Sequence, residues 1–286
     1  MSEPALIGTT TLMRRAFAGE NLEATARVLL ERIRINPGDA NAAMDLSILF
    51  ELGGDSLLAM EFQASALSQQ SLFREKESLS PTLKVLAIKS RGVIMDNMPL
   101  GFLLENSTVQ LESLYVGLGI QAPGEIPDHD VAIVAICESD MNQDLLADLA
   151  SVVAQWPRPV VNDPVHIANL SRDRLGKVVE NIDGLVFASS TRWQRHELES
   201  LDAGPQRSKL GTSVAGWIIR PTNSHAGHGL EHIAMEQSFS PYLERTSGDD
   251  FLIAPFVPYA SADGIYRKYR IALIRGESFP VHIALS

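Results

Sequence analysis

Cysteine is almost absent from the sequence. Cys137 is the single cysteine in 286 residues, so an internal disulfide is excluded, and this composition is consistent with a reducing cytoplasm. Cys137 ends the apolar run VAIVAIC at residues 131–137. We therefore interpret it as a buried core thiol rather than a nucleophile.

Basic residues are in the minority, and long apolar runs are missing. The chain has 24 Lys+Arg against 35 Asp+Glu, a formal net charge of −11, which repels the phosphates of nucleic acids and anionic lipids. No apolar run approaches the roughly 20 residues that a membrane helix needs. The N-terminal MSEPALIGTT lacks the basic and then apolar pattern of a signal peptide. The sequence thus predicts a cytoplasmic protein with no nucleic-acid partner and no membrane partner.

The length and the changing residue pattern predict several domains. A chain of 286 residues exceeds the usual single hydrophobic core. We predict a multidomain α + α/β protein with a helical region at 1–75, a small parallel α/β domain at 76–190 and an α+β module at 191–286.

The first region carries apolar residues at helical spacing. Helices are predicted over residues 22–33, 42–50 and 56–67. Small residues between the apolar ones permit close helix packing, and the arrangement resembles a tetratricopeptide-type helical array, which implies a protein partner for these repeats. The alternative is a helical hairpin of no particular family that serves only as a cap or a dimer face.

The middle region alternates strand and helix signals. After a predicted linker at 71–82, which is rich in Ser and charge, apolar runs predict strands at 83–90, 107–116, 131–137 and 158–162. An amphipathic helix is predicted at 142–156, between the last two strands. Apolar runs separated by a helix are typical of a parallel α/β sheet.

One segment of this region matches a dinucleotide-binding fingerprint. GLGIQA at 117–122 fits G-x-G-x-x-A after a strand, and Glu138 follows at a suitable distance. That fingerprint must open a helix, however, and Pro123 and Pro127 forbid one. We therefore predict no dinucleotide site here.

Two charged segments are interpreted as solvated surface. Residues 171–181 form a short predicted helix whose charges face solvent. Arg192, Arg195 and His196 are predicted to lie on a surface helix.

The stretch GWIIRPTNSHAGHGLEHI at 216–233 predicts a strand, a glycine-bearing loop and a second ordered segment. In such a loop, successive backbone N–H groups turn toward one point and form a concave anion site. Arg220, at the end of the strand, adds a cation with bidentate geometry for phosphate oxygens.

Two alternatives remain open for this loop. Glycine-rich strand ends also occur without any ligand, because glycine serves wherever φ is positive. A metal site could use His225, His228 and His232, which fall within eight residues. No Cys accompanies these histidines, and the glycines argue against one helix through all three.

Three stretches of the C-terminal region resemble the ATP-grasp superfamily, in the manner of glutathione synthetase and related carboxylate-amine ligases: residues 218–233, 251–259 and 263–286. The segment 160–175 is similar to the one that precedes many ATP-grasp domains. The resemblance implies ATP as cofactor, with Mg²⁺. It implies that a cation ends the first strand and that a flexible glycine-rich loop covers the ATP phosphates. It also implies that the backbone of a hinge segment pairs with adenine, and that an arginine on the following strand contacts phosphate or substrate. The nucleotide-binding positions carried over are Arg220, Ser224, His225, Ala226, Gly227, His228, Gly229, Phe256 and Val257, and the catalytic one is Arg270. Lys268 joins the nucleotide-binding residues because strand alternation puts it on the same face as Arg270.

The chain departs from the family pattern in ways that bear on activity. Arg220 stands where the family commonly has Lys, and Pro255 stands where it has an acidic residue. The acidic and Asn residues that hold magnesium in the family lie beyond Ser286. We therefore expect an incomplete module that binds ATP or ADP weakly, without appreciable turnover. The complete fold would ligate a carboxylate to an amine through an acyl phosphate. The alternative function is a non-catalytic interaction protein whose repeats bind a partner.

The last part is predicted to be an antiparallel meander of FLIAPFV, YRKYRIALIR and SFPVHIAL. Strand alternation puts Lys268 and Arg270 on one face, where both could reach an anion. The alternative is that they pair with carboxylates on a neighbouring strand. Apolar side chains such as Ile283 beside an unpaired sheet edge predict self-association or a partner that adds a strand.

Overall fold

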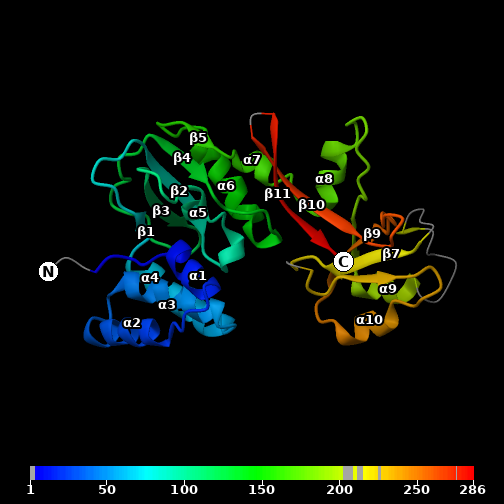
Figure 1. The fold of residues 1–286 in the computed structure, drawn as a ribbon, viewed down its shortest axis with the longest axis horizontal. Helices are drawn as coiled ribbons and strands as arrows, with labels where there is room; N and C mark the ends of the chain where they lie inside the picture. Colours follow the sequence, from blue (N-terminus) through cyan, green and yellow to red (C-terminus); the bar gives the residue numbers. More distant parts are fainter. Residues whose placement is uncertain (1–3, 202–208, 211–214, 225–226, 275) are drawn as a thin grey trace. The chain divides into compact units, whose positions relative to one another are not determined.

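The computed structural model describes residues 4–201, 209–210, 215–224, 227–274 and 276–286. The chain divides into two compact units, of which the first ends at Ser171 and the second begins at Arg172 (Figure 1). The finer predicted division at residues 75 and 190 stays a prediction. Within the described residues, no helix is long and apolar enough to cross a membrane.

The first unit begins with four helices: α1 (Thr9–Phe17), α2 (Glu23–Ile35), α3 (Ala40–Leu52) and α4 (Ser56–Gln69). Asp39 and Asp55 begin α3 and α4, because each carboxylate accepts a backbone N–H of the first turn, at 2.9 and 3.1 Å. The three predicted helices are confirmed, and α1 is an additional one. Their assignment to tetratricopeptide-type repeats stays a prediction.

Helix α3 is the buried centre of this helical region. Its residues 42 to 48 are all buried, including the carboxylate of Asp45. Asp45 accepts the backbone N–H groups of Ile7 at 2.8 Å and Gly8 at 2.9 Å, and so fixes the segment that leads into α1. A buried carboxylate needs such partners because its desolvation is costly.

A five-stranded sheet in the order β1-β3-β2-β4-β5 completes the first unit. Its strands are β1 (Leu72–Lys76), β2 (Lys84–Ser90), β3 (Gln110–Val116), β4 (Val131–Val134) and β5 (Val160–Val161). Strands β2 to β5 run parallel, as predicted, and β1 pairs antiparallel with β3. Because both faces are covered, β2 is buried along almost its whole length.

The helices of this α/β part cover opposite faces of the sheet. Helix α6 (Gln143–Val153) and the short α7 (Pro164–Ile167) pack on Leu86, Ile88 and Val134. Helix α5 (Leu100–Leu103) packs Leu100 on the other face, against Val85 and Ala87. Two 3-10 turns complete the connections: η1 (Ile94–Asp96) and η2 (Asp140–Asn142).

The predicted linker at 71–82 is wrong for residues 72–76, which form the edge strand β1. Phe73 is 1% exposed and makes an edge-to-face contact with Tyr115, at 5.7 Å between ring centroids. The segment resembles a linker because it contains three charged residues in a row, Arg74, Glu75 and Lys76. An edge strand tolerates such charge because it needs few inward apolar side chains.

The GLGIQA segment opens no helix in the structure. It follows β3 as a turn, with positive φ at Gly117 and Gly119. The prediction that 117–122 lacks the context of a dinucleotide site is therefore confirmed.

The second unit contains a four-stranded antiparallel sheet in the order β6-β9-β7-β8. Its strands are β6 (Thr191–Gln194), β7 (Trp217–Pro221), β8 (Glu231–Ile233) and β9 (Asp250–Pro255). Helices α9 (Arg195–Leu201) and α10 (Ser240–Arg245) pack Leu198, Tyr242 and Leu243 on Ile219 and Phe251. Helix α8 (Arg172–Val179) opens the unit, where the sequence predicts a helix.

The predicted surface helix around Arg192 is partly wrong. Arg192 lies in β6, and Arg195 is the first residue of α9. The Arg195 guanidinium donates to the carbonyls of Leu243 at 2.8 Å and Thr246 at 2.6 Å, so it caps the end of α10. His196 is exposed on α9, as predicted.

The predicted three-stranded meander is also wrong. Strand β9 lies between β6 and β7, whereas β10 (Arg267–Ile274) and β11 (Glu277–Leu285) form a separate antiparallel hairpin. The reason is burial. Phe251, Leu252 and Ile253 of β9 are at most 4% exposed and belong in a core, while Leu273 and Leu285 are 76% and 65% exposed.

Candidate functional site

The site predicted around Arg220 is built on the β7–β8 hairpin. Pairing of Trp217 with Ile233 and of Ile219 with Glu231 places Arg220 where the strands separate. Its Nε donates to Ser224 Oγ at 2.9 Å, and its Nη2 donates to the Ser224 carbonyl. The structure thus brings Arg220 and Ser224 together and ties the guanidinium to the start of the loop.

The surroundings of Arg220 are electropositive. Burial is the main cause that lowers the pKa of Arg220, and the Arg172 guanidinium adds to it, against a smaller opposite effect of Tyr242. No ion pair neutralises Arg220 or Arg172 within the part of the chain that the structure describes. Two neighbouring cations without a carboxylate repel each other and attract an anion.

The two glycines of the loop have different roles. Gly229 has φ of 65°, and a Cβ there would lie 2.8 Å from Pro221 Cδ. Its carbonyl accepts the Tyr242 hydroxyl at 2.7 Å, so Gly229 is needed for packing. Gly227, with φ of 82°, faces open space. His228 is exposed, and the predicted site residues His225 and Ala226 lie outside the described residues.

Of the three histidines in the metal alternative, His228 and His232 belong to the described residues. The His232 ring lies tilted against the Phe256 ring, with 4.1 Å between ring centroids, and its Nε2 lies 2.6 Å from the Ala215 carbonyl. Among the described residues, no group of three His, Cys, Asp or Glu side chains could hold a metal ion. The described side chains therefore provide no set of donors that fits Mg²⁺.

The predicted hinge lies at the other end of β7. Phe256 follows β9, and its N–H donates to the Gly216 carbonyl at 2.9 Å. The Phe256 ring also lies 6.3 Å from the Tyr266 ring. No backbone hydrogen bond in the described chain uses the Phe256 carbonyl or the Val257 N–H. One acceptor and one donor thus remain beside Gly216, which is about 13 Å from Arg220 at the usual strand rise.

Lys268 and Arg270 are exposed on β10, and no contact joins them to Arg220 within the described chain. On the neighbouring strand they lie opposite Ala284 and His282, neither of which carries a carboxylate. The predicted alternative, that both cations pair with carboxylates on that strand, is therefore wrong. The carboxylate of this region, Asp263, instead pairs with Arg267. Both cations are therefore available to an anion.

Arg172 is the site residue that the sequence analysis missed. It lies 48 positions before Arg220 in a segment interpreted as solvated surface. Only the fold brings the first residue of α8 close to the end of β7, and no local pattern records that proximity.

The chain was compared with known proteins. No protein-family model matches it, and no curated protein matches it. Among solved structures, it is similar to D-alanine-D-alanine ligase from Helicobacter pylori, at 14% identity and a TM-score of 0.35 over 56% of this chain and 45% of that one. It is also similar to a RimK domain ATP-grasp protein from Sphaerobacter thermophilus, at 14% identity and a TM-score of 0.36 over 65% of this chain and 68% of that one.

A third similar structure is N5-carboxyaminoimidazole ribonucleotide synthetase from Thermotoga maritima, at 12% identity and a TM-score of 0.36 over 71% of this chain and 53% of that one. The matches thus span about half of the first and third of these proteins. Superpositions with TM-scores this low do not establish a shared fold, so the ATP-grasp resemblance of residues 218–286 stays a prediction.

Proposed function

We propose that the second unit binds ATP or ADP. The observation that carries this proposal is the pair of guanidiniums, Arg220 and Arg172, which lie close together beside a glycine-bearing loop with no carboxylate to neutralise them. Such a pair is costly without an anion, and a polyphosphate supplies one with several oxygens for bidentate contact.

The remaining residues of the site suit the other parts of a nucleotide. The Gly227 N–H can approach phosphate oxygens because Gly227 faces open space. At the other end of β7, the Phe256 carbonyl and the Val257 N–H match the acceptor and donor that the adenine edge requires. The distance of about 13 Å along β7 is suitable for a base at one end and phosphates at the other.

The reaction class that we propose is ligation of a carboxylate to an amine, with ATP consumed to activate the carboxylate. Arg270 and Lys268 would then contact phosphate or substrate from β10, and Arg270 would be the catalytic one. No step is assigned to Mg²⁺, because the described side chains do not form a site for it. The predicted lack of turnover in this chain stays a prediction.

A second candidate function is a non-catalytic interaction protein. Its support is the set of exposed apolar side chains on α2 and α4, where Val28 is 62%, Ile35 72% and Leu57 78% exposed. Such side chains suit a partner helix or a second copy of the chain.

Titration calorimetry of the full chain with ATP and ADP, with and without magnesium, tests nucleotide binding. We expect weak binding that becomes ten- to a hundredfold weaker in Arg220→Gln and Arg172→Gln, because each change removes about 1.5–3 kcal/mol of charge-assisted contact. Arg27→Gln, an exposed arginine of the first unit, is the control. No heat with either nucleotide at millimolar concentration would contradict the proposal.

A further inference from the structure

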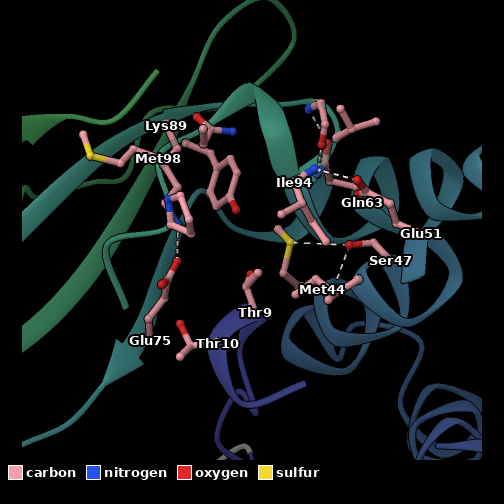
Figure 2. Close-up of a pocket in the computed structure, with 16 residues that line it drawn as sticks. Thr9, Thr10, Met44, Ser47, Glu51, Gln63, Glu75, Lys89, Ile94 and Met98 are labelled. Carbon is pink, nitrogen blue, oxygen red and sulfur yellow. Dashed lines mark hydrogen bonds and ion pairs between the residues drawn. The ribbon is translucent and has the colours of Figure 1, made fainter. Parts of the chain in front are cut away.

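A hollow in the first unit lies at the carboxyl end of β2, between the sheet and the helices (Figure 2). Its space of about 40 Å³ exceeds the roughly 10–15 Å³ that one water needs. The side chains that line it come from α1, α3, α4, β1, β2, β3 and the loop after β2. The end of a parallel strand is a common place for ligands in α/β proteins.

The walls of this hollow are fixed. Gly92 is held to Gln63 by two hydrogen bonds, of 2.7 and 2.8 Å. Asn97 closes the loop after β2, because its amide exchanges two hydrogen bonds with the Ser90 backbone, at 2.9 and 2.8 Å. The hollow is therefore formed before any ligand arrives.

A buried cation with spare donors lies in the wall. The Lys89 side chain is 6% exposed, and its ammonium pairs with Glu75, which also accepts the Ser113 hydroxyl at 2.7 Å. Burial is the largest single effect and acts to lower the pKa of Lys89, but the Glu75 charge, Tyr115 and the hydrogen bond to Glu75 together outweigh it, so the pKa is raised overall. The ammonium has three N–H groups, and Glu75 is its one acceptor among the described residues.

Tyr115 supplies a second donor. The Lys89 ammonium lies 5.9 Å from the centre of its ring. Burial raises the pKa of Tyr115, so its hydroxyl stays protonated. No described residue accepts a hydrogen bond from the Tyr115 hydroxyl. Thr9 and Thr10, at the start of α1, line the same hollow beside Glu75 (Figure 2), where helix N–H groups add positive potential.

We infer that this hollow binds a small carboxylate, whose oxygens accept from the Lys89 ammonium and the Tyr115 hydroxyl near the first turn of α1. A carboxylate suits the site better than a phosphate for two reasons. The space holds only a few heavy atoms, and the carboxylates of Glu75 and Glu51, which both line the hollow, repel a dianion more strongly than a monoanion. This site is independent of the proposed nucleotide site, which lies in the other unit.

Titration of the ¹⁵N-labelled full chain with sodium acetate tests the inference, with sodium chloride as the ionic-strength control and acetamide as the neutral isostere. The amide resonances of Thr9, Thr10 and Tyr115 are followed. We expect saturable shifts with acetate and none with acetamide. Tyr115→Phe should weaken acetate binding about tenfold, which corresponds to about 1.4 kcal/mol.

The double variant Glu75→Met/Lys89→Met should abolish acetate binding, and it leaves no buried charge unpaired. Lys84→Met changes a partly exposed cation of the same strand that pairs with Asp128, and this variant should bind acetate as the unchanged chain does. Where the double variant does not fold, Tyr115→Phe decides, because it removes one oxygen only. Linear shifts that never saturate, or equal binding by Tyr115→Phe, would show that the Lys89–Glu75 pair serves only to hold β1 on the sheet.

Discussion

Single residues carry the strongest local constraints of this protein, and Asp45 is the clearest case. Burial raises the pKa of Asp45 from 3.8 to about 6, although the N–H groups of Ile7 and Gly8 and the charge of Arg32 act in the opposite direction. Between these two pH values the folded state holds a proton that the unfolded state has released. This contribution to stability is complete below pH 3.8 and is lost as the pH rises through about 6.

We predict that Asp45→Asn removes this pH dependence. The stability of the unchanged chain relative to the variant should fall from pH 4 to pH 6.5 by at most about 3 kcal/mol, the equivalent of that pKa difference. Urea unfolding at several pH values measures it. Carboxylates whose pKa is lowered, such as Asp128, contribute equally to both chains, so the comparison with the variant removes their effect. A difference in unfolding free energy that does not change with pH would contradict the prediction.

The loop glycines give a matched pair of variants. Gly229→Ala places a Cβ against Pro221 at a positive φ, whereas Gly227→Ala meets the strained φ alone. We expect Gly229→Ala to cost about 1–3 kcal/mol more than Gly227→Ala. Thermal unfolding of both variants checks this, and equal costs would show that Pro221 moves aside.

At this scale the sequence predicted part of the site. Arg220 and Ser224 are four residues apart, so a local pattern was sufficient to place them together, and the structure does so. Arg172 could not be found in the same way, because its proximity depends on how α8 and β7 pack. The buried Lys89 was missed for a similar reason: its partner Glu75 belongs to a strand that resembled a linker.

The secondary-structure elements show which patterns are reliable. Strands β2 and β4 are apolar on both faces and lie where the sequence predicted them. The edge strand β1 has too few apolar residues to be recognised. Strand β9 was recognised but wrongly paired, because alternation within a strand does not specify its neighbour.

We predict that Phe73→Ala destabilises the first unit by about 3–5 kcal/mol, since it removes the one fully buried aromatic ring of β1. Leu79→Ala, at a fully exposed leucine between β1 and β2, is the control and should have almost no effect. Urea unfolding followed by circular dichroism measures both. A small effect of Phe73→Ala would mean that β1 contributes little to the sheet.

At the scale of the whole molecule, the two units have separate hydrophobic cores. We predict two unfolding transitions in calorimetry, because separate cores need not melt together. Phe73→Ala should lower the temperature of one transition, and Gly229→Ala that of the other. A single transition that both variants shift equally would show that the units unfold as one.

Each unit is also continuous in sequence, since no strand of the first sheet comes from beyond Val161 in the part of the chain that the structure describes. A ribosome therefore synthesises every strand of the five-stranded sheet before it synthesises β6. The first unit can complete its core during synthesis, at the usual 5–20 residues per second or so. Misfolding by pairing of strands from different units is thereby limited in time, because the edge strand β1 already lies against β3 when the later strands emerge.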